Sequence, residues 1–177
     1  MSPQTDLGKI TGKGVHKQRT INPGDSISVA GVRVTAFSLF HDSPGAQSYR
    51  VQCGDICIVL ITDTGKVSNE MHSIALGADI LLLEANYNEQ MLKTGPYPIH
   101  IKRRIRSDVG HLSNYNAAEF INDLALSPTL RRVYLCHISA VNNNPTTLEG
   151  DLRRHLVNPI QWHICPRGEM VAINTGP

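Results

Sequence analysis

Residues 56–65 read Ile-Cys-Ile-Val-Leu-Ile-Thr-Asp-Thr-Gly, and the predicted fold is organised around this stretch. A short apolar run that ends in turn residues is typical of a buried strand. Between residues 27 and 53, before this run, apolar residues alternate with polar ones in short segments, which predicts antiparallel strands joined by tight turns. After residue 65 the pattern changes to helices alternating with buried strands. This order predicts an α/β (α+β) fold, a sheet with helices packed outside it.

Capping residues and apolar periodicity locate the elements after residue 65. Ser68 and Ser113 each precede an amphipathic segment and are predicted helix N-caps, and Thr146 or Thr147 is predicted to begin a further helix. The expected helices cover residues 68–76, 88–93, 98–106, 113–124 and 146–156, and the expected strands cover residues 80–83, 133–136, 160–164 and 169–173.

The bulk composition indicates a soluble globular protein. Of 177 residues, 41% are apolar and 18% are charged, and no apolar run approaches the roughly 18 residues of a membrane span. Residues 1–24 show no periodicity and are expected to be a weakly ordered lead-in to one domain over residues 25–177. The four cysteines form no Cys-x-x-Cys pair, so buried, reduced thiols and a cytoplasmic location are expected.

Charge neither identifies nor excludes a nucleic-acid partner. The net charge is +2, which is compatible with a phosphate-bearing substrate. Lys102, Arg103, Arg104 and Arg106 form a basic run in which the intervening isoleucines would face the core of a helix. The charges in that run are either solvated or part of a phosphate-contacting patch.

Three polar side chains follow apolar strands at the point where each strand ends. His41, Asp63 and His137 stand in these positions. If the three strand ends are adjacent in space, they bring two imidazoles and one carboxylate together, a ligand set that suits Zn or Mn. The alternative is that each side chain satisfies local backbone groups.

Other polar residues near strand and helix ends are further candidates. His111 lies just before a capped helix and is either a loop residue, a metal ligand or a proton donor. Glu84 ends a buried strand, where a carboxylate usually has a partner. Glu84, with Asn86 close behind it, is a candidate to orient a ligating histidine.

These stretches resemble a known family. His41-Asp42-Ser43, residues 62–65 and residues 135–139 resemble the third, fourth and fifth metal-binding motifs of the metallo-β-lactamase superfamily. Residues 82–89, residues 92–98 and the segment Gly-His-Leu-Ser-Asn at 110–114 resemble its YycJ-like branch, small proteins related to ribonuclease Z and regarded as exonucleases.

The resemblance implies a four-layer αββα sandwich and a two-metal phosphodiesterase or nuclease that uses Zn or Mn. His41 would bind one metal, Asp63 would bridge both, and His137 would bind the second. His111 would stabilise the transition state or protonate the leaving group. The expected substrate-binding residues are Arg103, Arg104, Ser113 and Asn114, and the residues expected to support the ligands are Glu84 and Asn86.

The sequence departs from the family in one respect. The motif His-x-His-x-Asp-His, which should precede His41, does not occur in the chain. We therefore expect an N-terminally incomplete domain with weak metal binding and little hydrolysis unless another segment completes the site. Two alternatives stay open. One is a non-catalytic remnant that pairs through a sheet edge with a second copy or a complementing N-terminal segment. The other is a hydrolase of thioesters, lactones or lactams, which residues 110–114 disfavour.

Overall fold

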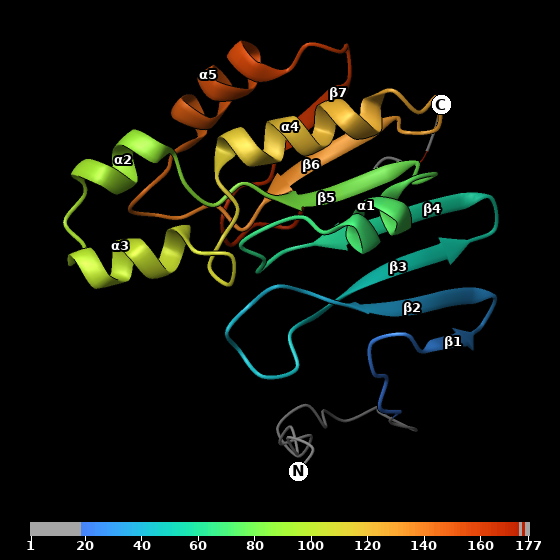
Figure 1. The fold of residues 1–177 in the computed structure, drawn as a ribbon. Helices are drawn as coiled ribbons and strands as arrows, with labels where there is room; N and C mark the ends of the chain where they lie inside the picture. Colours follow the sequence, from blue (N-terminus) through green and yellow to red (C-terminus); the bar gives the residue numbers. More distant parts are fainter. Residues whose placement is uncertain (1–18, 174, 176–177) are drawn as a thin grey trace.

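The computed structural model describes residues 19–173 and residue 175. Its strands form one seven-stranded sheet whose spatial order follows the sequence (Figure 1). Neighbouring strands are antiparallel from β1 to β4 and parallel from β4 to β7. The strands are β1 (Ser26–Val29), β2 (Val32–Ser38), β3 (Gln47–Cys53), β4 (Ile56–Ile61), β5 (Ile80–Glu84), β6 (Arg132–Cys136) and β7 (Gln161–Ile164).

The predicted mixed α/β class is confirmed, and the pairing changes from antiparallel to parallel at β4, the strand within residues 56–65. The described part of the chain supplies one of the two sheets that an αββα sandwich contains. Most of the expected lead-in, residues 1–18, lies outside the described residues.

Helices cover one face of the sheet and one end of it (Figure 1). α1, α4 and α5 contribute buried apolar side chains to the main core, which also contains the inward-facing residues of the central strands. α2 and α3 lie at one end, where Leu92 of α2 and Ile105 of α3 form a small second core with Tyr87, which precedes α2. The helices are α1 (Asn69–Ala75), α2 (Glu89–Thr94), α3 (Ile99–Arg106), α4 (Asn114–Ala125) and α5 (Pro145–His155).

The two faces of β4 are buried to different extents. Cys57, Val59 and Ile61 face the helices and are almost completely buried. The alternate residues Ile58 and Leu60 are only half-buried, because no described helix packs on that face in Figure 1. The apolar run is therefore a fully buried strand on one side of the sheet only.

Several expected boundaries were wrong. Residues 169–173 form no strand and are exposed. α5 begins at Pro145 rather than at Thr146 or Thr147, because the side chain of Asn144 accepts a hydrogen bond from the backbone N–H of Thr147 and proline is well suited to a first helical position. Cys53 is exposed near the β3–β4 turn, whereas a buried thiol was expected, and all four cysteines are unpaired.

None of the helices in the described part of the chain has the length and apolarity that a membrane crossing requires.

Candidate metal centre

The candidate site lies at the carboxyl ends of three adjacent parallel strands. Glu84 is the last residue of β5, and it stands in register with Cys136 at the end of β6. Asp63 follows β4 and His137 follows β6, so the two flank Glu84 along the sheet edge. Parallel strands present their carboxyl ends at one edge, which is where ligands bind in open α/β sheets.

The backbone at this edge is unusual at two positions. Asp63 and His137 have φ angles of 59° and 53°, in the left-handed region that non-glycine residues seldom adopt. The only other such residue in the described part of the chain is Ala30. Left-handed non-glycine residues cost free energy and gather at functional sites. Two of them at the ends of β4 and β6, on either side of β5, therefore mark this edge as a candidate site.

Glu84 holds the site together. Its side chain is fully buried, and its Oε1 atom accepts hydrogen bonds from the Nδ1 atoms of His111 and His137, each at 2.7 Å. Its Oε2 atom accepts hydrogen bonds from the backbone N–H groups of Thr64, at 3.1 Å, and of Leu112, at 3.4 Å. Because Thr64 follows Asp63 and Leu112 follows His111, one carboxylate positions all three segments.

The hydrogen bonds also shift the pKa values of Glu84 and His137. Burial raises the pKa of Glu84, but the hydrogen bonds from His111 and His137 outweigh it, and the net pKa is lowered. The hydrogen bond to Glu84 raises the pKa of His137. Glu84 is therefore charged over the whole neutral range. When the rings are neutral, Glu84 holds the proton of each on Nδ1 and leaves the Nε2 lone pair free.

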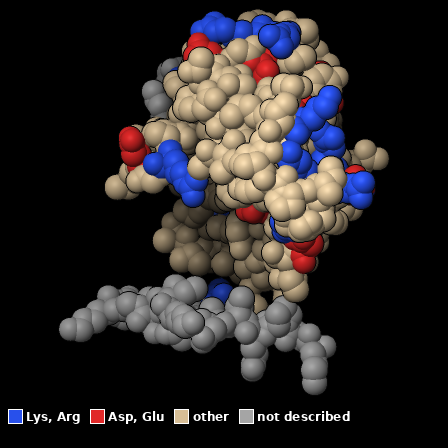
Figure 2. Space-filling view, turned by 90° about the vertical axis from the view of Figure 1, so that its left-hand side faces the viewer, with Lys and Arg blue, Asp and Glu red and all other residues tan. Residues whose placement is uncertain are grey.

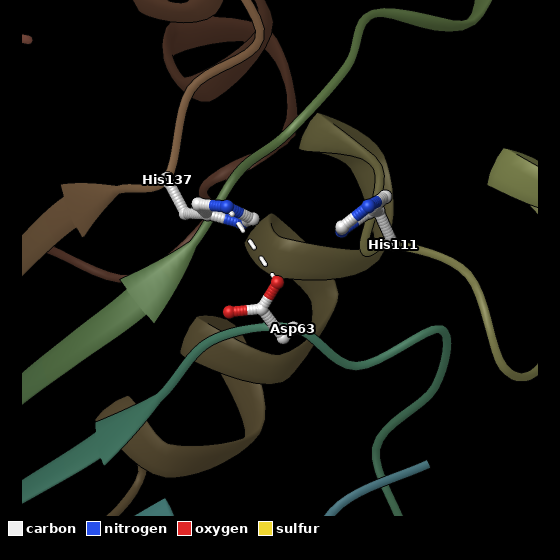
Figure 3. A group of neighbouring side chains, drawn as sticks. All are labelled: Asp63, His111 and His137. Atoms are coloured by element: carbon white, nitrogen blue, oxygen red, sulfur yellow. Dashed lines mark ion pairs between the residues drawn. The ribbon is translucent and has the colours of Figure 1, made fainter. Parts of the chain in front are cut away.

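Three ligand atoms converge in front of Glu84. The candidate donor atoms of Asp63, His111 and His137 all lie within 4.8 Å of one another, and Asp63 Oδ1 is 3.6 Å from His137 Nε2 (Figure 3). Figure 3 shows the three side chains turned toward a common space from separate segments. Two imidazole nitrogens and a carboxylate oxygen suit zinc or manganese, and a carboxylate behind each histidine is the usual support of metal-ligating histidines. The donor set therefore fits a divalent ion.

His41 lies next to this group but not within it. Its ring centroid is 5.3 Å from that of His111, its Nδ1 is 3.1 Å from the carbonyl oxygen of Gly110, and its Nε2 is 3.7 Å from Asp42 Oδ1. The predicted ligands His41, Asp63 and His137 thus line one pocket, while the tight donor group contains His111 in place of His41. Asn86 supports the same region, because its side-chain amide donates to the carbonyl oxygen of His137 at 2.9 Å.

Two glycines allow the loop before α4 to deliver His111. A Cβ atom on Gly110 would overlap with the carbonyl oxygens of Arg104 and Ile105, and one on Gly65 would overlap with the backbone of residues 107–108. The loop is thus pressed against the end of α3 on one side and against residues 63–65 on the other. Only glycine permits backbones to approach this closely.

Of the four residues expected to contact substrate, one lines the site pocket and three do not. Arg104 lines the site pocket and makes a bidentate ion pair with Asp42, which lowers the pKa of that carboxyl group. Arg103 lines a different pocket, on another side of α3. Ser113 is buried as the N-cap of α4, and Asn114 is buried with its side chain bonded to Asn143 and Asp151. Ser113 and Asn114 thus serve the local structure and do not line the site pocket.

Sequence reasoning missed other residues of the pocket, which has a volume of about 920 Å³. Arg167 lines it after β7, and its positive charge acts against protonation of His137. Ser139 and Asn142 line it after β6. No local signal marks these residues, since they belong to irregular segments that only the parallel pairing of β6 and β7 brings to the site.

Comparison with known proteins places the chain in a family. The family described as "Beta-lactamase superfamily domain" matches residues 4–138. The chain belongs to this family. The match covers most of the described sheet, from β1 to β6, and includes Asp63, His111 and His137.

Curated relatives of this family member confirm the resemblance to the YycJ-like branch. The chain is 36% identical over 137 residues to exodeoxyribonuclease WalJ of Streptococcus pneumoniae, covering 77% of this chain and 49% of the relative. It is 38% identical over 120 residues to exodeoxyribonuclease YycJ of Bacillus anthracis, covering 68% of this chain and 45% of the relative. The chain therefore spans about half the length of these relatives.

Solved structures support the fold. The metallo-β-lactamase fold protein YhfI of Bacillus subtilis superposes with a TM-score of 0.66 at 16% identity, over 90% of this chain and 57% of that protein. Zinc-bound PqqB of Methylobacterium extorquens superposes with a TM-score of 0.63 at 18% identity, over 89% and 56%. At these identities the likeness concerns the fold alone.

Proposed function

We propose that this superfamily chain carries the catalytic edge of a metal-dependent phosphodiesterase, a nuclease that hydrolyses nucleic acid. One observation carries the proposal: the buried Glu84 carboxylate holds two histidines that each have a ring nitrogen within 4.8 Å of a carboxylate oxygen of Asp63. The names of the relatives, which are exodeoxyribonucleases, support the substrate class.

Asp63, His111 and His137 would hold the divalent ion, zinc or manganese. When bound, such an ion would lower the pKa of a water molecule and polarise a phosphoryl oxygen. The Nδ1–H groups that His111 and His137 donate to Glu84 fix both ring orientations before any ligand arrives. His41, on the other side of His111, is the residue placed to complete a second ion position or to move a proton.

Arg167 and Arg104 are the cations placed to hold a substrate phosphate. Arg104 already pairs with Asp42, so it would contribute mainly to the local potential. Arg167 lines the pocket near His137 and has no carboxylate within ion-pair distance among the described residues. A guanidinium matches a phosphate bidentately. We therefore assign Arg167 the more direct contact.

The test is the affinity of the 177-residue chain for zinc and for manganese, measured by calorimetric titration. We expect weak binding, because the described residues bring only Asp63 and two histidines within 4.8 Å of one another. Asp63→Asn and His137→Ala should each lower the affinity at least about tenfold, while Asp123→Asn, on the exposed part of α4 away from the pocket, should bind as the unchanged chain does. Equal affinity in all four proteins would overturn the proposed site.

The same titration distinguishes two roles for His111, metal ligand and general acid. If His111 is a ligand, His111→Ala loses metal affinity together with His137→Ala. If it acts only as an acid, His111→Ala keeps the affinity and lowers the rate of phosphodiester hydrolysis about 10²- to 10⁴-fold. The rate is measured with a labelled oligonucleotide, and we expect slow turnover by this chain. Tight binding of two ions per chain, or fast turnover, would contradict the expectation of an incomplete site.

A further inference from the structure

A second surface, away from the metal centre, carries a concentration of positive charge. Two adjoining pockets at the α2–α3 end of the molecule share Lys93 and Arg106 in their walls. The smaller, of about 290 Å³, also includes Lys102 and Arg103, and the larger, of about 610 Å³, also includes Arg154. We call these five residues the cationic band. Figure 2 faces this end and shows Lys and Arg side chains in separate groups around a largely uncharged centre, with Asp and Glu side chains among them.

Most of the charge of the cationic band is not neutralised locally. Arg106 pairs with Glu89 at 2.6 Å. Among the described residues, no carboxylate forms an ion pair with Lys93, Arg103 or Arg154. The other carboxylate in the walls, Asp151, accepts hydrogen bonds from asparagine side chains instead. The chain as a whole has a net charge of only +2, whereas the walls of these two pockets hold five cations and two carboxylates.

An aromatic pair lies in the same surface. The ring of Tyr115 at the start of α4 meets the ring of His155 at the end of α5, with centroids 5.1 Å apart and planes at 90°. Tyr115 is 47% exposed, and both residues line the larger pocket beside Arg154. Exposed aromatic rings among unpaired cations are the usual components of surfaces that bind single-stranded nucleic acid, in which bases stack on rings and phosphates contact cations.

α3 connects this surface to the metal centre. Arg104 lines the pocket of the metal centre, whereas its neighbours Arg103 and Arg106 line the pockets of the cationic band. A strand that leaves the metal centre across α3 would therefore pass the two pockets of the cationic band, the larger of which also contains Tyr115.

We propose that the cationic band and Tyr115 form a binding track for a single-stranded nucleic acid, which holds the strand beyond the nucleotide at the metal centre. The proposal rests on the proposed function for the nature of the substrate. The phosphates would contact Lys93, Arg103 and Arg154, and one base would stack on Tyr115.

The test measures binding without catalysis. A fluorescein-labelled oligothymidylate of about 15 nucleotides is titrated in EDTA, by fluorescence anisotropy, at about 50 to 200 mM salt. The double variant Lys93→Gln/Arg154→Gln should raise Kd about tenfold and reduce the slope of log K against log salt by about 1.4. The matched control Arg19→Gln/Arg33→Gln removes two exposed cations from the other end of the sheet and should change Kd less than about twofold.

The stacking component has its own pair of variants. Tyr115→Ala should raise Kd at least about fivefold with an unchanged salt slope, and Tyr115→Phe, which keeps the ring, should bind as the unchanged chain does. The track is overturned if the two double variants bind equally, if Tyr115→Ala has no effect, or if a duplex of the same length binds as tightly and with the same losses.

Failure of the track is distinguishable from failure of the proposed function. Binding in EDTA does not depend on the metal centre, so Asp63→Asn should retain oligonucleotide affinity while losing metal affinity. Loss of both properties in Asp63→Asn, with its thermal unfolding unchanged, would contradict the separation of the two surfaces.

Discussion

At the scale of single residues, the site depends on Glu84. This side chain is buried, charged and bonded to four groups from three segments, so its own desolvation is compensated by hydrogen bonds. The same bonds hold both imidazoles in the tautomer that offers Nε2 to an ion. Glu84 thus links the stability of the sheet edge to the chemistry of the pocket.

Replacement of Glu84 tests this link. Glu84→Gln should lower metal affinity about 10- to 100-fold, because an amide accepts weaker hydrogen bonds from His111 and His137 and adds a donor that has no acceptor there. Calorimetric titration measures the affinity. Glu119→Gln, at an exposed position of α4, is the control and should bind as the unchanged chain does. Unaltered affinity in Glu84→Gln would show that the histidines do not depend on this carboxylate.

The raised pKa of His137 predicts a pH dependence of folding in the metal-free protein. The Glu84 hydrogen bond raises the pKa above the ordinary 6.5, so the charged ring stabilises the folded state. This stabilisation is complete below the ordinary value and is lost as pH rises through the raised one. Urea unfolding in EDTA should therefore show His137→Gln to be more destabilising at about pH 6 than at about pH 9. A constant difference, or a larger one at the higher pH, would contradict the assigned direction.

Arg167 carries a third prediction at this scale. Arg167→Gln should weaken the binding of a fluorescent nucleoside monophosphate about tenfold or more, because a charged hydrogen bond to phosphate is lost. Its control is Arg131→Gln. Arg131 forms an ion pair with Asp79 where β5 and β6 begin, at the opposite end of these strands from the pocket. Equal losses in both variants would indicate an effect of net charge rather than a contact.

At the scale of elements, the loop between α3 and α4 decides where His111 lies. It begins at the end of α3, contacts residues 63–65 through Gly65, and enters α4 through the Ser113 cap. Its packing is backbone against backbone, so a small change in volume moves the histidine.

Two glycine substitutions distinguish an effect of this close packing from the general effect of replacing glycine with alanine. Gly110→Ala should lower the free energy of unfolding by about 1–3 kcal/mol or more, because the added Cβ overlaps with the end of α3. Gly150→Ala lies in α5, where a Cβ meets nothing within 4 Å, and should raise it by about 0.5–1 kcal/mol. Denaturant unfolding measures both. A stable Gly110→Ala with full metal affinity would show that the loop does not position His111.

At the scale of the whole molecule, the strand order brings the site together. β4, β5 and β6 are adjacent and parallel, so residues far apart in the sequence end at one edge. An ion held by these ends joins segments that separate on unfolding, and binding to the folded state alone must stabilise it.

Metal should therefore raise the unfolding temperature. At about 100 times its Kd, zinc or manganese should add about 2.7 kcal/mol to the free energy of unfolding. Asp63→Asn should lose most of this gain, whereas its stability in EDTA should fall little, because the Asp63 side chain is partly exposed and, among the described residues, forms an ion pair with His137 alone. Differential scanning fluorimetry measures both. An equal gain in the variant would place the ion elsewhere.

Local patterns in the sequence determined much of the fold: the strand at residues 56–61, the change from alternating to continuous apolar segments, and the helix caps at Ser68 and Ser113. They also marked Glu84, because a carboxylate at the end of a buried strand needs a partner close by. These features depend on residues that are close together in the sequence, so they can be predicted from the sequence alone.

Only the tertiary structure decided which side chains share one point. It placed His111 among the converging donors and His41 beside them, assigned both histidines to one carboxylate, and brought Arg167 into the pocket. The reason is that distances between strand ends depend on the order of the strands and on backbone contacts such as that of Gly110. The periodicity of apolar residues along a chain predicts neither the strand order nor these contacts.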